Sequence, residues 1–135
     1  MATTVSPLAK KLQIKAGLKV ALVNAPPGTA ERLRPLPSDA TISRGPAADT
    51  VIAFAKDDAE LQTIVPQAIR ALRADGRLWI SYPKGSTTMK TDLNRDVLRE
   101  IVDERHGFEG VSLVAVDDTW SAMRFRSRGT RKATR

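Results

Sequence analysis

Residues 78–95, LWISYPKGSTTMKTDLNR, begin as an apolar strand, continue as a polar loop between two lysines and end at the start of a helix. In an open α/β sheet, ligands bind beyond the carboxyl ends of the strands, where a helix N-terminus offers free N–H groups and a partial positive charge. The stretch therefore predicts an α/β fold and a candidate ligand position. Neither it nor the rest of the chain carries a known catalytic signature, so whether the protein is an enzyme stays open.

Strands and helices are expected to alternate on both sides of this stretch. The apolar spacing predicts helices at 6–16, 29–33, 57–74 and 92–105, and strands at 18–24, 40–43, 50–55, 77–82, 111–116 and 120–126. Only a tight turn separates the last two strands, which permits an antiparallel hairpin and nothing else. This order predicts a three-layer Rossmann-like α/β sandwich, with a mostly parallel sheet and a C-terminal antiparallel hairpin.

The sequence leaves the pairing of one segment and the course of one helix open. Only residues 44–49 separate the strands at 40–43 and 50–55, whereas a parallel crossover usually takes a dozen residues or more. The segment 40–43 is therefore either no true strand or an irregularly paired one. Pro66 falls inside the helix at 57–74 and predicts a kink or two consecutive helices. In the helix at 92–105, Thr91 is the expected N-cap, and Gly107 is expected to end the helix.

The net charge of +7 is concentrated at the carboxyl end of the chain. Residues 124–135 contain six basic and no acidic residues, so the other residues are almost neutral in sum. We expect a single Rossmann-like domain over residues 1–126 and a basic, disordered tail over residues 127–135. Such a tail binds nucleic acid with strong salt dependence, or it only aids solubility. The candidate nucleic-acid-binding residues are Arg126, Arg128, Arg131, Lys132 and Arg135.

Composition excludes several classes of protein. No apolar run approaches the roughly 20 residues that span a bilayer, and the amino terminus lacks the apolar region of a secretory signal, so a cytoplasmic location without a membrane partner is expected. The absence of cysteine excludes disulfides, thiolate catalysis and cysteine-based zinc sites. Exposed strand edges would allow a homodimer.

Two loops supply the candidate ligand-binding residues. The loop before the helix at 92–105 combines hydroxyl and ammonium groups that suit an anion, although Gly, Ser and Thr are also ordinary loop residues. The segment Asn24-Ala25-Pro26-Pro27-Gly28 follows the first strand, where Gly28 permits close approach but the prolines remove N–H donors. We expect a small anionic or nucleotide ligand and identify no cofactor. The candidates are Asn24, Pro26, Gly28, Tyr82, Lys84, Ser86, Thr87, Lys90, Asn94 and Arg95.

Other side chains have a structural and a functional interpretation. Tyr82 either stacks on a base or covers the core. Asp117 and Asp118 would suit a divalent cation, but aspartate is equally favoured in tight turns, and no metal site is predicted. His106 is expected at the C-terminal end of its helix, where the helix dipole favours a cation. Trp79 and Trp120 are expected to pack in the core or at its rim.

Residues 48–55, ADTVIAFA, together with ADGRLWISYP and VAVDDTWSAMRF and the helices between them, resemble the second half of class I methyltransferases. Those enzymes hold S-adenosylmethionine on a Gly-rich, acidic E/D-x-G-x-G loop, and this chain has the segment 24–28 in its place. Nearly the whole chain, through LQIKAGLKVALVNAPPG, LRADGRLWISYPKGS, KTDLNRD and VAVDDTWSAMRF, is similar to a family of small uncharacterised bacterial proteins, a domain of unknown function with a methyltransferase-related, Rossmann-like fold. That resemblance implies no catalytic residues.

Three functions remain open at this stage. The favoured hypothesis is a Rossmann-like protein that binds a small ligand, such as a nucleotide or an anion, with the loops at 24–28 and 82–91. The second is a degenerate S-adenosylmethionine-dependent methyltransferase-like protein. The third is an interaction protein whose basic tail binds nucleic acid.

Overall fold

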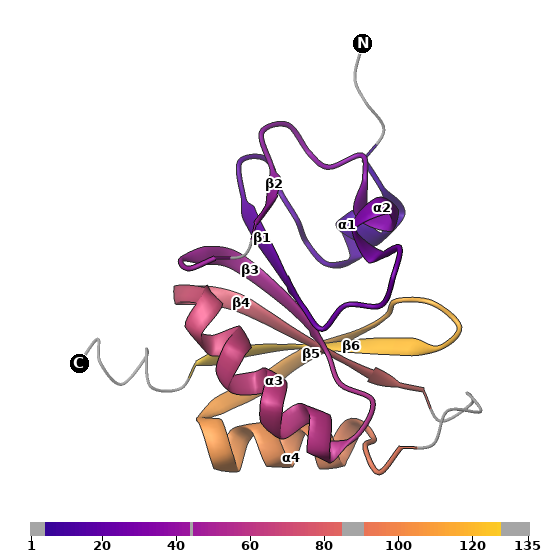
Figure 1. Ribbon diagram of the computed structural model, residues 1–135, viewed down its shortest axis with the longest axis vertical. Helices are drawn as coiled ribbons and strands as arrows, with labels where there is room; N and C mark the ends of the chain where they lie inside the picture. The colour runs from indigo at the N-terminus through magenta and orange to yellow at the C-terminus, as the bar shows by residue number, and fades with distance from the viewer. Residues whose placement is uncertain (1–4, 44, 85–90, 128–135) are drawn as a thin grey trace.

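The structure is a computed structural model that describes residues 5–43, 45–84 and 91–127. Within these residues, six strands form one sheet of order β2-β1-β3-β4-β6-β5 (Figure 1). The first four strands in this order run parallel to one another, and β6 runs antiparallel to both β4 and β5. This confirms the predicted mixed sheet with a C-terminal hairpin. The strands are β1 (Lys19–Val23), β2 (Thr41–Ser43), β3 (Ala48–Phe54), β4 (Leu72–Pro83), β5 (Phe108–Ala115) and β6 (Trp120–Ser127).

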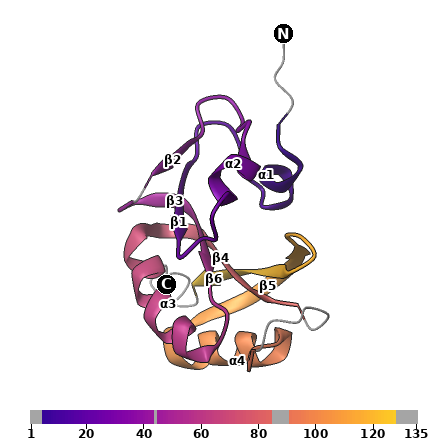
Figure 2. The same ribbon diagram turned by 45° about the vertical axis from the view of Figure 1, so that its right-hand side comes forward.

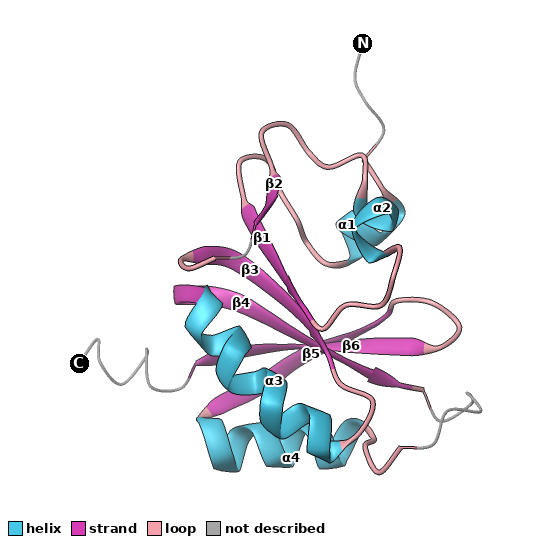
Figure 3. Cartoon of the chain, viewed as in Figure 1, coloured by secondary structure: helices cyan, strands magenta, loops and turns pink. Residues whose placement is uncertain are grey.

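Helices cover both faces of the sheet, as Figures 1–3 show. α3 (Asp58–Ala71) and α4 (Arg95–His106) lie together on one face, and the short helices α1 (Pro7–Lys11) and α2 (Thr29–Leu33) lie on the other. Alternate residues of each strand serve the two cores, because successive strand side chains point to opposite faces. Thus Ile80 packs in the core with α3 and α4, and its neighbour Trp79 packs with α1. The three predicted layers are confirmed.

The short connection from β2 to β3 has a geometric explanation. β2 is a true strand that pairs in parallel with β1 through Thr41 to Ser43, and β3 pairs with the other side of β1. The chain must return by about three residues along the strand axis and cross two strand spacings, which is a span of about 14 Å. Four or five extended residues reach that far, so no crossover helix is needed.

Of the two amino-terminal helices, only α1 differs from the expectation. α2 has the predicted bounds, but α1 ends at Lys11 rather than at residue 16. The cause is tertiary, since the carbonyl of Leu12 accepts a hydrogen bond of 3.1 Å from Nε1 of the buried Trp79. Ser6 caps α1 as expected for this sequence, with its hydroxyl accepting from the N–H groups of Leu8 and Ala9.

The two long helices also differ from the predicted ones. Of the two alternatives predicted at Pro66, a kink or two consecutive helices, the second is wrong, because α3 is one continuous helix through Pro66. α4 begins at Arg95, and its N-cap is Asn94 rather than the predicted Thr91. The Thr91 hydroxyl accepts instead from the N–H of Leu93 at 3.0 Å, in a turn that directs the Leu93 side chain into the core. Gly107 ends α4 as predicted, with a positive φ of 73°.

The strands at the carboxyl half are longer than predicted. β4 begins at Leu72, directly after α3, because Leu72 pairs with Ala48 before the register shifts. β6 continues to Ser127, so it includes the first residue of the predicted tail, and residues 128–135 lie outside the described part of the chain. Among the described residues, no helix is both long enough and apolar enough to cross a bilayer.

Candidate functional site

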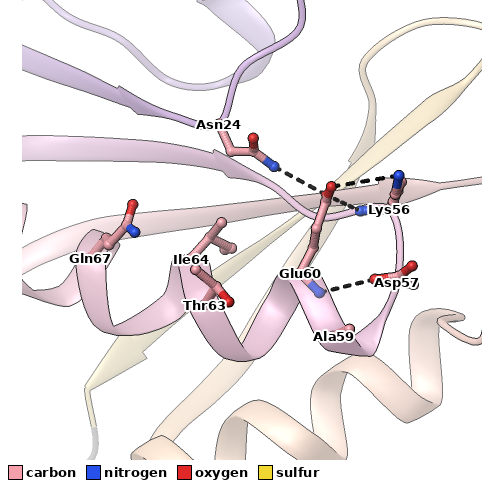
Figure 4. A pocket seen from close by; sticks show the side chains of 8 residues that line it. All are labelled: Asn24, Lys56, Asp57, Ala59, Glu60, Thr63, Ile64 and Gln67. Atoms are coloured by element: carbon pink, nitrogen blue, oxygen red, sulfur yellow. Dashed lines mark hydrogen bonds and ion pairs between the residues drawn. The ribbon is translucent and has the colours of Figure 1, made fainter.

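The strand order reverses between β1 and β3. The chain leaves β1 for β2 on one side, and β3, β4 and the hairpin lie on the other. In open α/β sheets, ligands bind at this switch point, beyond the carboxyl ends of the two strands. An open hollow of about 620 Å³ lies there, which is a usual size for a small-molecule site. Its walls come from the end of β1, the loop after β3 and one side of α3 (Figure 4), through Asn24, Lys56, Asp57, Ala59, Glu60, Thr63, Ile64 and Gln67.

Asn24 joins the three elements that surround this switch-point hollow. It follows β1 directly and has a positive φ of 57°, a conformation that asparagine tolerates better than most residues. Its Nδ2 donates to the Phe54 carbonyl at 2.8 Å and to Glu60 Oε1 at 3.1 Å. The amide therefore links the ends of β1 and β3 to the first turn of α3.

Glu60 is held by the loop between β3 and α3 as well. Its Oε1 accepts the Lys56 N–H at 2.9 Å, and its Oε2 lies 3.9 Å from Lys56 Nζ. Asp57 caps α3, with Oδ1 accepting the Glu60 N–H at 2.9 Å. This reciprocal pattern resembles a capping box, in which side chains at the N-cap and at N3 satisfy free N–H groups. The inner end of the hollow is therefore pre-arranged before any ligand enters.

The lining of the switch-point hollow favours a particular ligand chemistry. Two carboxylates, Asp57 and Glu60, outnumber the single ammonium group of Lys56. The Thr63 hydroxyl and the Gln67 amide continue the polar wall along α3 (Figure 4). Carboxylate and amide oxygens accept hydrogen bonds from hydroxyl and amino groups. The arrangement therefore suits a neutral or cationic polar molecule better than a phosphate.

The loop after β1 offers few donors. Pro26 and Pro27 have no N–H, and the Pro26 carbonyl already accepts from both the N–H and the hydroxyl of Thr29, at 3.2 and 2.7 Å. Gly28 has a φ of 86°, and a Cβ there would meet no atom within 4 Å. Glycine is thus required by the backbone, and the space beside it is open.

The described residues of the other predicted loop have structural roles. Tyr82 is only 6% exposed and belongs to the core beneath α3 and α4, which favours the packing interpretation over base stacking. Burial raises the pKa of its phenol above the ordinary value, although the charge of Arg95 and a hydrogen bond with Ser121 lower that pKa in part. The Lys84 N–H donates to the Thr119 carbonyl at 2.8 Å. The predicted ligand residues Ser86, Thr87 and Lys90 lie outside the described residues.

Asn94 and Arg95 are not brought to the switch point. Asn94 Oδ1 accepts the Val97 N–H at 2.9 Å as the N-cap of α4. Arg95 lines a separate hollow of about 250 Å³ beside β5 and forms an exposed ion pair of 3.4 Å with Asp96. Exposed pairs of this kind add little stability.

Asp117 has the turn chemistry that the sequence predicts. Its Oδ1 accepts the N–H groups of Thr119 and Trp120, both at 2.8 Å, and its Oδ2 lies 2.9 Å from Arg32 Nη1. Burial alone would raise the pKa of Asp117, but the two N–H groups and the guanidinium outweigh it and lower the pKa. No group of three or more potential metal ligands occurs in the described ranges.

His106 and Arg126 are each influenced by neighbouring residues. His106 is the last residue of α4, as expected, but burial and then the charge of Arg105 lower its pKa, which favours the neutral ring over the expected cation. Arg126 is paired with Glu109 across the β5–β6 hairpin. The other candidate nucleic-acid-binding residues, Arg128, Arg131, Lys132 and Arg135, fall beyond the described chain.

Sequence reasoning found Asn24 but missed Lys56, Asp57 and Glu60. The available signal was the segment AKDDAE, which follows the apolar strand at 50–55 with a capping-box spacing. That spacing predicts the start of a helix. Only the sheet order shows that this helix begins at the switch point.

Comparison with known proteins identifies the fold. No family model and no curated protein match the chain. Among solved structures, the N-methyltransferase NodS from Bradyrhizobium japonicum WM9 is similar at a TM-score of 0.59 and 14% identity, over 88% of this chain and 92% of that one. A SAM-dependent methyltransferase from Aquifex aeolicus is similar at a TM-score of 0.57 and 10% identity, over 90% of this chain and 89% of that one.

A third similar structure contains bound molecules. The 1,6-didemethyltoxoflavin-N1-methyltransferase from Burkholderia thailandensis, with 1,6-didemethyltoxoflavin and S-adenosylhomocysteine bound, gives a TM-score of 0.55 and 14% identity, over 90% of this chain and 76% of that one. At such low identities the likeness is one of fold. The chain therefore has the Rossmann-like fold of the S-adenosylmethionine-dependent methyltransferases.

Proposed function

We propose that this chain is a degenerate methyltransferase-like protein that binds a small polar molecule in the switch-point hollow. The observation that carries the proposal is the position of Asn24, Lys56 and Glu60 between the carboxyl ends of β1 and β3. A fold of this type places its ligand there. We further propose, from the sequence resemblance, that the chain belongs to the family of small uncharacterised bacterial proteins.

The loop after β1 does not fit S-adenosylmethionine in the way that the Gly-rich loop of class I methyltransferases would. Pro26 and Pro27 remove two N–H donors, and the Asn24 amide is already bonded to Phe54 and Glu60. These contacts close the inner end of the crevice. No methyl-transfer step is therefore assigned to these residues.

A nucleoside-type molecule fits the lining better than an anion does. Ribose hydroxyls and amino groups are donors, and the oxygens of Asp57, Glu60 and Gln67 are acceptors on one wall of the hollow. S-adenosylhomocysteine, which the Burkholderia enzyme binds, carries donors of both kinds. Adenosine presents the same ribose without the amino-acid arm, so the two molecules test separate parts of the hollow.

The test is an amide NMR titration of the labelled full chain with adenosine, S-adenosylhomocysteine and S-adenosylmethionine. We expect adenosine to shift the amides of Asn24, Lys56 and Glu60. Glu60→Gln keeps the side-chain shape and removes the charge, and should weaken binding by about tenfold, since a hydrogen bond to a charged group is lost. Glu104→Gln, an exposed position on α4, is the matched control.

The titration separates the remaining outcomes. If none of the three molecules shifts the residues of the hollow at millimolar concentration, the proposal is wrong. Tighter binding of S-adenosylmethionine than of adenosine at the same residues would show that a methyl-donor site survives despite the altered loop.

A further inference from the structure

A further hollow, of about 230 Å³, lies at the end of the sheet opposite to the switch-point hollow. Its lining residues come from the beginnings of β3 and β4 and from the segment before β1. Figure 1 shows β3 and β4 beginning on the left, where the antiparallel β6 ends. The switch-point hollow lies at the carboxyl ends of β1 and β3, so the two sites are distinct. The residues that line this amino-end hollow are Lys15, Leu18, Asp49, Thr50, Arg73 and Arg77.

The single acid in the amino-end hollow is already neutralised. Asp49 Oδ1 lies 2.6 Å from Arg73 Nε, and its Oδ2 accepts the Lys19 N–H at 2.8 Å. The Lys19 N–H lowers the pKa of Asp49 most, burial opposes it, and Arg73 lowers it further. Asp49 therefore stays ionised and paired with Arg73.

Two cations of the hollow have no acidic partner among the described residues. Lys15 makes no ion pair there, and Arg77 only donates from Nη1 to the Gln13 carbonyl at a long 3.4 Å. Arg77 is half-buried, so its charge is less screened than that of a fully exposed side chain. The lining thus carries a positive charge that no acidic side chain described in the structure balances.

Neighbouring strand residues add to this charge. Arg124 on β6 lies near Arg77, and its pKa is lowered first by burial and then by the charges of Arg77 and Arg126. The Arg124 side chain donates to the Ser112 hydroxyl, and Glu109 pairs with Arg126. Like charges this close repel one another, and an anion between them would relieve the repulsion.

Thr50 gives an independent indication. It lines the hollow and is fully buried, yet its hydroxyl has no hydrogen-bond partner in the described structure. Buried polar groups are nearly always paired, so an unpaired one calls for an explanation. A ligand oxygen in the hollow would supply the missing partner.

We infer that the amino-end hollow binds a phosphate group, held by Lys15, Arg77 and Thr50. A phosphate offers several acceptor oxygens and a charge that arginine and lysine both recognise. This site is independent of the function proposed for the switch-point hollow. The phosphate comes from a free nucleotide or phosphate ester, or from a nucleic-acid backbone. The sequence supports the backbone source, since β6 ends at this side of the sheet and Arg128, Arg131, Lys132 and Arg135 come after it in the sequence.

The first test is an amide NMR titration of the full chain with inorganic phosphate. We expect shifts at Lys15, Thr50 and Arg77. Arg77→Gln should weaken phosphate binding by about tenfold or more, since it removes a charge-assisted hydrogen bond. Arg34→Gln makes the same charge change at an exposed position after α2 and should leave the affinity unchanged.

Thr50→Val separates a ligand-binding role from a merely unpaired hydroxyl. The valine is close in shape and lacks the hydroxyl, so thermal stability without phosphate should rise in either case. Only a hydroxyl that donates to the ligand makes the same substitution weaken phosphate binding. If both Arg77→Gln and Thr50→Val leave the phosphate affinity unchanged, the inference is overturned.

A short single-stranded oligonucleotide distinguishes the two sources of phosphate. If the backbone is the source, the oligonucleotide binds more tightly than inorganic phosphate at the same residues, and Arg77→Gln lowers the slope of log affinity against log salt by about 0.7. Equal or weaker oligonucleotide binding assigns the site to a free phosphate compound. If deletion of residues 128–135 abolishes all phosphate shifts while Arg77→Gln has no effect, the hollow is not the binding site.

Discussion

Replacement of Asp117 by alanine should detach the β5–β6 turn from α2. The carboxylate accepts hydrogen bonds from two N–H groups of its own turn. It also pairs with Arg32, which lies 85 positions earlier in the sequence. Asp118 is the next residue, is exposed, and makes no hydrogen bond or ion pair with the described residues. Asp118→Ala is therefore a control with the same change of composition and charge.

The expected loss in the free energy of unfolding follows from these contacts. Two hydrogen bonds to a carboxylate contribute about 1–1.5 kcal/mol each at a partly exposed site. The ion pair with Arg32, whose side chain is 44% exposed, adds about 0.5 kcal/mol. Asp117→Ala should thus cost about 2.5–3.5 kcal/mol, whereas Asp117→Asn keeps an acceptor for the turn and should cost about 1 kcal/mol. Asp118→Ala should stay within about 0.5 kcal/mol of the parent.

Urea unfolding at several pH values measures these free energies. The pKa of folded Asp117 is below its ordinary value, so its contribution is fully present above the unfolded pKa and is lost as the pH falls through the folded pKa. The difference between parent and Asp117→Ala should therefore be constant near neutral pH and shrink below about pH 4. An Asp117→Ala protein as stable as Asp118→Ala at pH 7 would refute this account of the turn.

The remaining predictions concern the helices and the core. Asn94→Ala should cost about 1 kcal/mol because it removes the N-cap of α4, and Thr91→Ala should cost less; the reverse order in chemical unfolding would contradict the observed cap. Ser81→Ala should raise stability by about 1 kcal/mol, since its buried hydroxyl lacks a partner in the described chain, and a loss would show that a partner is present. His106 is the only histidine, so its ring protons can be followed by NMR and should titrate below pH 6.5. The stability that depends on the neutral ring is present above the unfolded pKa and should be lost as the pH falls through the folded pKa. A midpoint at or above 6.5 would count against its burial.

The fold class was predictable because local pattern and tertiary structure agree. β1 and β3 are nearly continuous apolar runs, as expected for interior parallel strands covered on both faces. The apolar spacing of α3 matches the face that it buries. The tight turn around Asp117 left only one arrangement for the final hairpin.

Several boundaries were not predictable because distant contacts set them. The early start of β4 depends on the pairing of Leu72 with Ala48, and the early end of α1 depends on Trp79. The start of α4 depends on whether Thr91 or Asn94 caps the helix. Asn94 does so, because the Thr91 hydroxyl accepts the N–H of Leu93 instead.

The candidate site was predicted only in part for a related reason. A sequence gives the order of strands along the chain but not their order in the sheet, and the switch point is a property of the sheet. Asn24 was found because it follows a buried strand. Glu60 was missed because a glutamate three residues after a capping aspartate has an ordinary explanation in helix geometry.

The position of β6 bears on how the chain is assembled during synthesis. Among the described strands β6 is synthesised last, yet it lies inside the sheet between β4 and β5. Until Ser127 has emerged, β4 has an open edge and β5 has no strand to pair with. The described sheet can therefore be completed only after Ser127 has been made, and until then the open edge of β4 is exposed to wrong pairing.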